Sequence, residues 1–197
     1  MIGSGHALTA LLVLAQAAAP GRPAGATRDL AQALSRKIAD FEARHKAGKP
    51  PREKRVLVSD AELTAYLNLL SKLPPSLSDL DVRFDSERIQ ARGLLDLDQL
   101  QGKMQSGGAL SPFAFLSGRV SISIKGRLES EDGFGTFLPE EVKVGSLPLA
   151  ASMLEQIVAA ATRSAESPQG IDILAPFRYP YGVRQVRLSP GRAIVEF

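Results

Sequence analysis

Residues 119–128, RVSISIKGRL, decide the fold class of this chain. Apolar residues alternate with serine, lysine and arginine along the stretch, so one face of an extended chain would be apolar and the other polar. Successive side chains of a β-strand point to opposite faces of its sheet. This period of two is typical of antiparallel sheets that bury one face and leave the other in water. The stretch therefore predicts a half-buried strand of an antiparallel sheet.

Segments with the same alternation lie on both sides of this strand and are separated by short polar turns that contain Gly, Pro or Asp. Such runs, bounded by turn residues, predict a series of β-hairpins. The expected strands cover residues 80–84, 89–97, 119–128, 134–138, 141–147, 183–188 and 193–197.

Three other segments place apolar residues at helical spacing. The first has them at Leu30, Leu34, Ile38 and Phe41, and ends near Gly48. A second helix begins with the capping-box sequence Ser-Asp-Ala-Glu and extends to about residue 72. The third covers residues 149–164. Helices and hairpins in this order predict an α+β fold: a curved antiparallel sheet of about six strands with three helices packed on its apolar face.

The composition excludes several classes of protein. The chain has 197 residues, of which 44% are hydrophobic and 23% charged, as expected for one soluble globular domain. It has no cysteine, which excludes disulfides, thiol catalysis and cysteine-ligated zinc. One histidine, His45, remains outside the N-terminal segment, so no Ser-His-Asp triad can be argued. We expect no catalytic residue, no metal and no cofactor, and we expect the protein not to be an enzyme.

Residues 7–19, ALTALLVLAQAAA, form an uncharged apolar run of signal-peptide length, shorter than the roughly 20 residues of a membrane-spanning helix. Small residues follow at the spacing that signal peptidases accept. No lysine or arginine precedes the run, so a disordered tail or a buried helix of a cytosolic protein stays open. We expect a signal peptide or disordered N-terminus over residues 1–26, a single domain over 27–197, and a periplasmic or secreted location.

Charge argues against one class of partner and suggests another. Residues 1–26 hold only Arg22 among the formal charges, so the rest of the chain has a net charge of +2. Nucleic-acid binding needs a concentrated basic face and is therefore not expected. One basic run lies between the first two helices, and it is either a solvated connector or a contact with anionic lipid head groups. Its residues are Arg44, Lys46, Lys49, Arg52, Lys54 and Arg55.

Several cap, turn and strand signatures carry a resemblance to known proteins. They are residues 56–70 (VLVSDAELTAYLNLL), 73–75, 80–84, 93–100 (GLLDLDQL), 180–188 (PYGVRQVRL) and 191–195. Together they resemble the YpmS-like and LmeA-like families of bacterial extracytoplasmic proteins over most of residues 56–197. The resemblance implies an envelope protein that holds phospholipid or another lipid in an apolar cleft between a curved sheet and helices. No catalytic motif is among the signatures.

We therefore expect a non-enzymatic lipid-binding or lipid-carrying protein whose partners are a lipid or other apolar small molecule and an anionic membrane surface. The alternative is a cell-envelope scaffold or assembly factor with a closed core that binds a partner protein. Small residues at Ala91, Gly93 and Gly126 favour the cleft, because they leave room on apolar strand faces. The candidate lining residues, which a closed core would also contain, are Leu63, Tyr66, Leu67, Leu70, Val120, Ile122, Ile124, Phe134, Met153, Leu154 and Ile157.

Overall fold

The computed structural model describes residues 27–71, 73–99, 117–163 and 168–197. The expected signal segment, residues 1–26, lies outside the described residues. The elements of the described part are α2 (Arg28–Lys46), β1 (Arg55–Ser59), α3 (Asp60–Leu69), β2 (Leu77–Asp85), β3 (Arg88–Asp96), β4 (Arg119–Glu131), β5 (Phe134–Val144), β6 (Leu147–Pro148), α5 (Ala151–Thr162), β7 (Phe177–Arg178), β8 (Gln185–Ser189) and β9 (Arg192–Glu196).

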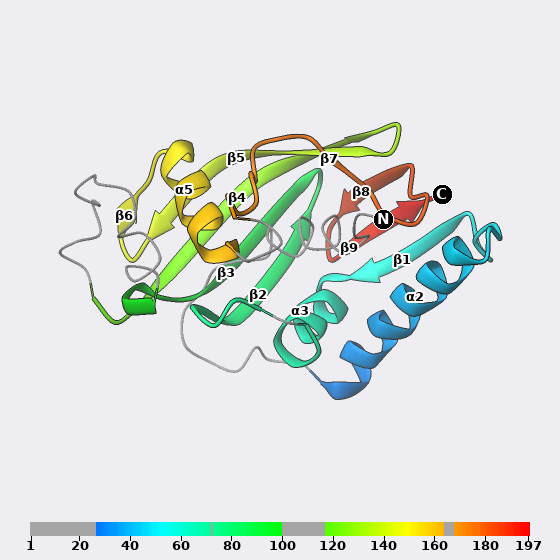
Figure 1. Ribbon diagram of the computed structural model, residues 1–197, viewed down its shortest axis with the longest axis horizontal. Helices are drawn as coiled ribbons and strands as arrows, with labels where there is room; N and C mark the ends of the chain where they lie inside the picture. Colours follow the sequence, from blue (N-terminus) through cyan, green and yellow to red (C-terminus); the bar gives the residue numbers. More distant parts are fainter. Residues whose placement is uncertain (1–26, 72, 100–116, 164–167) are drawn as a thin grey trace.

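The larger sheet is antiparallel and has the strand order β2-β3-β4-β5-β6, with β7 paired to β5 (Figure 1). This confirms the α+β class and the antiparallel sheet of six strands. The two strands expected at 134–138 and 141–147 were wrong, because residues 134–144 form the single strand β5. Pro139 lies within it opposite Gly126, where the register with β4 shifts. Such an irregularity tolerates the missing N–H of proline.

The C-terminal hairpin belongs to a second, three-stranded sheet with the order β1-β9-β8. This sheet joins segments from the two ends of the described chain, and its register places Val58 beside Ala193 and Val56 beside Val195. It is attached to the larger sheet by backbone hydrogen bonds. The N–H of Gly191, for example, donates to the carbonyl oxygen of Phe84 over 3.0 Å. The smaller sheet therefore extends one end of the larger one.

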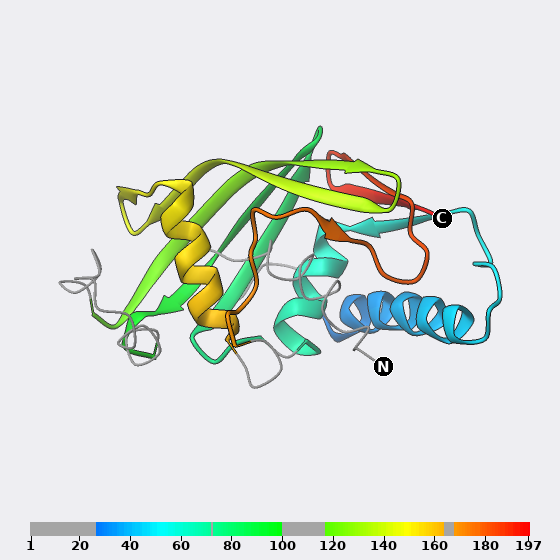
Figure 2. The ribbon, with the colours of Figure 1, turned by 45° about the horizontal axis from the view of Figure 1, so that its top comes forward.

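All three described helices lie on the same side of the strands, which confirms the predicted layering (Figure 2). α3 begins with the predicted capping box: the hydroxyl of Ser59 accepts from the N–H of Glu62, and the Glu62 carboxylate accepts from the N–H of Ser59. The helix ends at Leu69, before the expected residue 72, because the N–H of Ser71 bonds back to the carbonyl of Tyr66. This bond closes the last turn.

Two side chains of α3 form hydrogen bonds with the backbone of β2, along the edge where a neighbouring strand would otherwise pair. The hydroxyl of Thr64 accepts from the N–H of Val82 over 2.9 Å. The amide of Asn68 accepts from the N–H of Leu80 over 2.9 Å and donates to its carbonyl over 2.7 Å. Buried backbone groups are costly to leave unpaired, so these bonds both satisfy the edge of the sheet and fix α3 against it.

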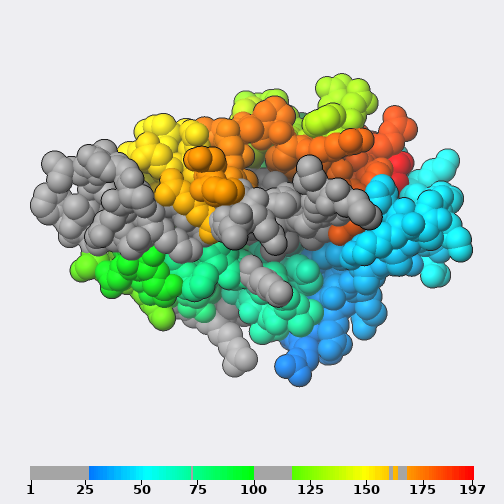
Figure 3. Space-filling model, viewed as in Figure 1, coloured from blue at the N-terminus to red at the C-terminus, as the bar shows by residue number. Residues whose placement is uncertain are grey.

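The apolar face of the larger sheet is closed. α5 adds Leu154, Ile157 and Val158, each at most 3% exposed, to the core. The room expected at Gly126 is occupied, since a Cβ atom there would lie 2.5 Å from the ring of Phe137. In the space-filling view, α5 lies toward one edge of the visible side of the molecule, and α3 with α2 lies toward the opposite edge (Figure 3). The larger sheet thus supplies the rigid core of the molecule.

Candidate functional site

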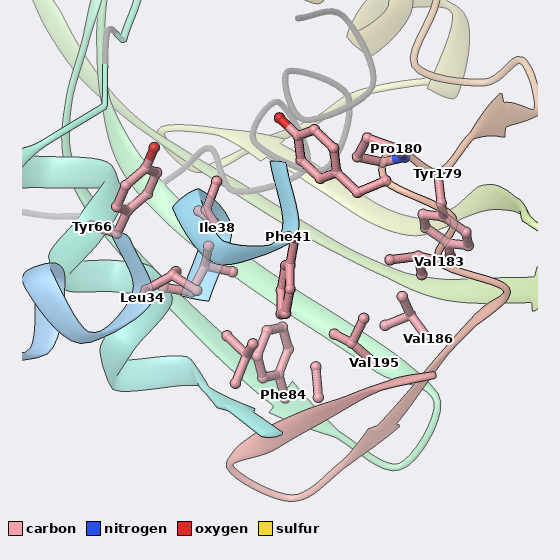
Figure 4. Close-up of a pocket in the computed structure, with 14 residues that line it drawn as sticks. Leu34, Ile38, Phe41, Tyr66, Phe84, Tyr179, Pro180, Val183, Val186 and Val195 are labelled. Carbon is pink, nitrogen blue, oxygen red and sulfur yellow. The ribbon is translucent and has the colours of Figure 1, made fainter. Parts of the chain in front are cut away.

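An apolar cavity of about 110 Å³ lies beside the smaller sheet, and Figure 4 shows its lining. Its residues come from α2, β1, α3, the end of β2, the segment that leads into β8, and the C-terminal hairpin. They are Leu34, Ile38, Phe41, Val58, Leu63, Tyr66, Phe84, Tyr179, Pro180, Tyr181, Val183, Val186, Ala193 and Val195. The cavity is partly open to solvent, and its surface is almost wholly aliphatic and aromatic.

The floor of the cavity is the inner face of the smaller sheet. Val186 and Val195 are register partners on β8 and β9, and Ala193 pairs with Val58 of β1. Ala193 is a small residue in a row of larger ones. Because alternate residues of a strand face the same side, Ala193 and Val195 present their side chains to the same cavity. The short side chain of alanine leaves part of this volume unfilled.

α2 forms the opposite wall. Leu34, Ile38 and Phe41 follow one another at helical spacing and all line the cavity. The ammonium group of Lys37 holds the helix in place, because it donates to the carbonyl oxygen of Leu57 and to the carboxylate of Glu62, both over 2.7 Å. Burial raises the pKa of Glu62, but the hydrogen bonds from Lys37 and Ser59 outweigh it, and this pKa lies below its ordinary value.

The segment before β8 forms the remaining wall and one side of the opening. Tyr181 and Gly182 both have positive φ angles, 58° and 79°. These left-handed conformations fold the chain sharply, and Tyr181 lines the cavity. Its ring also meets His45 of α2 edge-on, with 6.1 Å between the centroids. The opening therefore lies next to the C-terminal turn of α2.

Every tyrosine of the protein lines this cavity, and the protein has no tryptophan. Burial raises the pKa of Tyr66 and of Tyr181. Ionisation of Tyr66 would also raise the pKa of Tyr181, which places the two phenols near one another. The hydroxyl of Tyr179 lies elsewhere, beside Gly135. A Cβ atom added to Gly135 would lie 2.6 Å from this hydroxyl oxygen. Two of the three phenols thus belong to the opening.

The structure brings two of the eleven expected lining residues, Leu63 and Tyr66, to this cavity. The other nine do not line it. Leu70 and Phe134 are exposed, at 43% and 51%. The remaining seven belong to the buried core or pack against it: Leu67, Val120, Ile122, Ile124, Met153, Leu154 and Ile157.

Most of the cavity lining was missed by the sequence reasoning. Leu34, Ile38 and Phe41 were recognised as one helical face, and Val186 and Val195 as parts of a hairpin, but nothing joined these segments. The register of β1 with β9 is what brings them together. The aromatic pair Tyr179 and Tyr181 around one proline was a signal that could have marked the cavity wall.

Four of the six cations of the basic run form ion pairs within the described residues. Arg44 and Arg52 both pair with Asp40, at 3.2 and 3.1 Å, and Arg55 pairs with Glu196 at 2.7 Å. Lys46 pairs with Glu42. Lys49 and Lys54 are exposed and have no ion pair in the described part of the chain. These two lysines are the cations of the run that remain available to a surface.

Among the described residues, no cluster of histidine and carboxylate side chains has the arrangement that holds a metal ion. No helix in the described ranges has the length and apolarity needed to cross a membrane. Comparison of the chain with protein-family models, curated proteins and solved structures finds no match. The function must therefore be inferred from the geometry of the cavity itself.

Proposed function

We propose that this protein is a non-enzymatic extracytoplasmic lipid-binding protein that places an acyl chain in the cavity between α2, α3 and the smaller sheet. The observation that carries the proposal is a solvent-connected cavity with an almost wholly apolar surface. Small-molecule sites are concave and mostly apolar, with few polar groups. The signal-like segment at residues 7–19 supports the location, and the resemblance to envelope lipid-binding families supports the ligand class.

The size of the cavity limits what enters it. An engineered cavity of about 150 Å³ with a similar apolar lining binds benzene. A cavity of about 110 Å³ therefore admits the end of one hydrocarbon chain. Burial of a methylene group is favourable by about 0.8 kcal/mol. About four buried methylenes would thus contribute about 3 kcal/mol, or roughly a hundredfold in affinity.

The two unpaired lysines of the connector support delivery at an anionic membrane. The opening of the cavity adjoins the C-terminal turn of α2 through Tyr181 and His45, and the connector with Lys49 and Lys54 follows that turn directly. A near-surface cation contributes about 1 kcal/mol of attraction to anionic lipids at low salt. We propose that this side of the molecule faces the membrane when a chain enters or leaves.

Native mass spectrometry of protein purified from its own envelope fraction tests the proposal. We expect a mass increment of bound lipid on the wild type and its loss in Val195→Phe, whose ring fills the cavity. Leu57→Phe is the matched control, because Leu57 is 52% exposed on the same sheet and does not line the cavity. A lipid-free wild type with a stably bound protein partner would contradict lipid binding and support the scaffold alternative.

A further inference from the structure

The opening of the cavity has two polar groups that the apolar lining does not need. Figure 4 shows the hydroxyl group of Tyr66 pointing away from the side chains of the floor. Tyr181 lines the same cavity and lies near enough for ionisation of Tyr66 to raise its pKa. One tyrosine comes from α3 and the other from the segment before β8. Neither hydroxyl has a hydrogen-bond partner among the residues that the structure describes. Both are therefore free to bond to a ligand.

The two phenols can act only as neutral groups at ordinary pH. Burial raises the pKa of both above the usual value of a tyrosine, so each retains its proton and can donate it in a hydrogen bond. The ammonium group of Lys46 lies beside Tyr181, but it is already paired with the carboxylate of Glu42 and is therefore not free to bind the head group of a ligand. Recognition at the opening is therefore a matter of hydrogen-bond donors and not of a free cation.

We propose that the ligand is a single-chain amphiphile of the fatty-acid class, with its carboxylate accepting hydrogen bonds from Tyr66 and Tyr181 and its chain end in the cavity. This inference rests on the proposed function and names its ligand. The cavity volume excludes two acyl chains side by side. A carboxylate suits the two phenol donors, because it accepts hydrogen bonds through two oxygens and its negative charge strengthens them.

Two probes with different head groups separate the head from the tail. Hexane is an uncharged hydrocarbon whose chain end fits a cavity of about 110 Å³, and dodecanoate carries the carboxylate. We expect the wild type to bind both. In the double variant Tyr66→Phe/Tyr181→Phe, the dissociation constant for dodecanoate should rise at least about a hundredfold, the effect of losing two hydrogen bonds to a charged group, while that of hexane stays unchanged.

Leu57→Phe is the matched control, because Leu57 is 52% exposed on the smaller sheet and does not line the cavity. It should bind both probes as the wild type does. Unchanged dodecanoate affinity in the double variant, or equal losses for both probes, would overturn the head-group assignment while the cavity stands. A wild type that binds neither probe, or a Val195→Phe variant that binds both normally, would instead overturn the proposed function and this inference with it.

Discussion

The two sheets of this molecule have a similar alternation of apolar residues, but the apolar face of the larger sheet is closely packed and that of the smaller sheet borders a cavity. On the larger sheet, Ile122 and Ile124 are 2% and 1% exposed, and the ring of Phe137 fills the space at Gly126. On the smaller sheet, Val186, Ala193 and Val195 face a cavity instead. The difference lies in what covers each face, and the cavity borders the less completely covered one.

The comparison predicts that different parts of the molecule determine stability and ligand binding. Interiors packed to full density lose stability when a residue changes volume. A partly open wall made by one helix and one folded segment has less packing to lose. We therefore expect substitutions in the larger sheet to change stability and matched substitutions at the cavity to change binding.

Truncation should give the largest contrast. Leu154→Ala removes a side chain that is 0% exposed between α5 and the larger sheet, so the free energy of unfolding should fall by about 3 to 4 kcal/mol. Val195→Ala enlarges a cavity that already exists and should cost about 1 kcal/mol. Urea denaturation of both variants measures the difference. Equal losses would show that the two faces are packed alike.

Enlargement should show the opposite contrast. Ile122→Phe adds volume to a closed face and should lower the free energy of unfolding by about 2 to 3 kcal/mol. Val195→Phe places its ring in the cavity and should leave the melting temperature equal or higher. Differential scanning calorimetry compares them. A destabilised Val195→Phe with a stable Ile122→Phe would reverse the assignment of open and closed faces.

α3 connects the two regions, so loosening it should affect both. Asn68→Ala leaves the N–H and the carbonyl of Leu80 without their side-chain partner, and we expect a loss of about 2 kcal/mol. Because Leu63 and Tyr66 of the same helix line the cavity, probe binding should weaken as well. Arg83→Ala, at an exposed position of β2, is the control for stability. Unaltered binding in Asn68→Ala would mean that α3 does not depend on this contact for its position.

The smallest effect is expected at the start of α3. Ser59→Ala removes the cap and should lower the free energy of unfolding by about 1 kcal/mol, as measured by urea denaturation.

The folded-state pKa of Glu62 is depressed, so its stabilising effect is present above its unfolded pKa of about 4.5 and is lost as the pH falls through the folded value. Glu62→Gln should therefore be less stable than the wild type at pH 7, and the gap should close in acid. A gap independent of pH would contradict this linkage.

Local elements could be predicted from the sequence, and long-range packing could not. Alternation and capping signals located α2, α3 and most strands, because these patterns depend on neighbours a few residues apart. The pairing of β1 with β9 and the covering of Ile124 by other elements depend on contacts distant in sequence. Alternation is alike at Ile124 and Val195, so periodicity alone could not distinguish the closely packed face from the face that borders the cavity.

Intrinsic tyrosine fluorescence tests the central claim most directly, since all three tyrosines line the cavity and the protein has no tryptophan. Bromine quenches a fluorophore that it contacts, so 12-bromododecanoate reports whether a chain end reaches these rings. We predict saturable quenching in the wild type and in Leu57→Phe, and its loss in Val195→Phe. Equal quenching in Val195→Phe, or quenching that rises linearly without saturation in the wild type, would contradict the claim that this cavity holds an acyl chain.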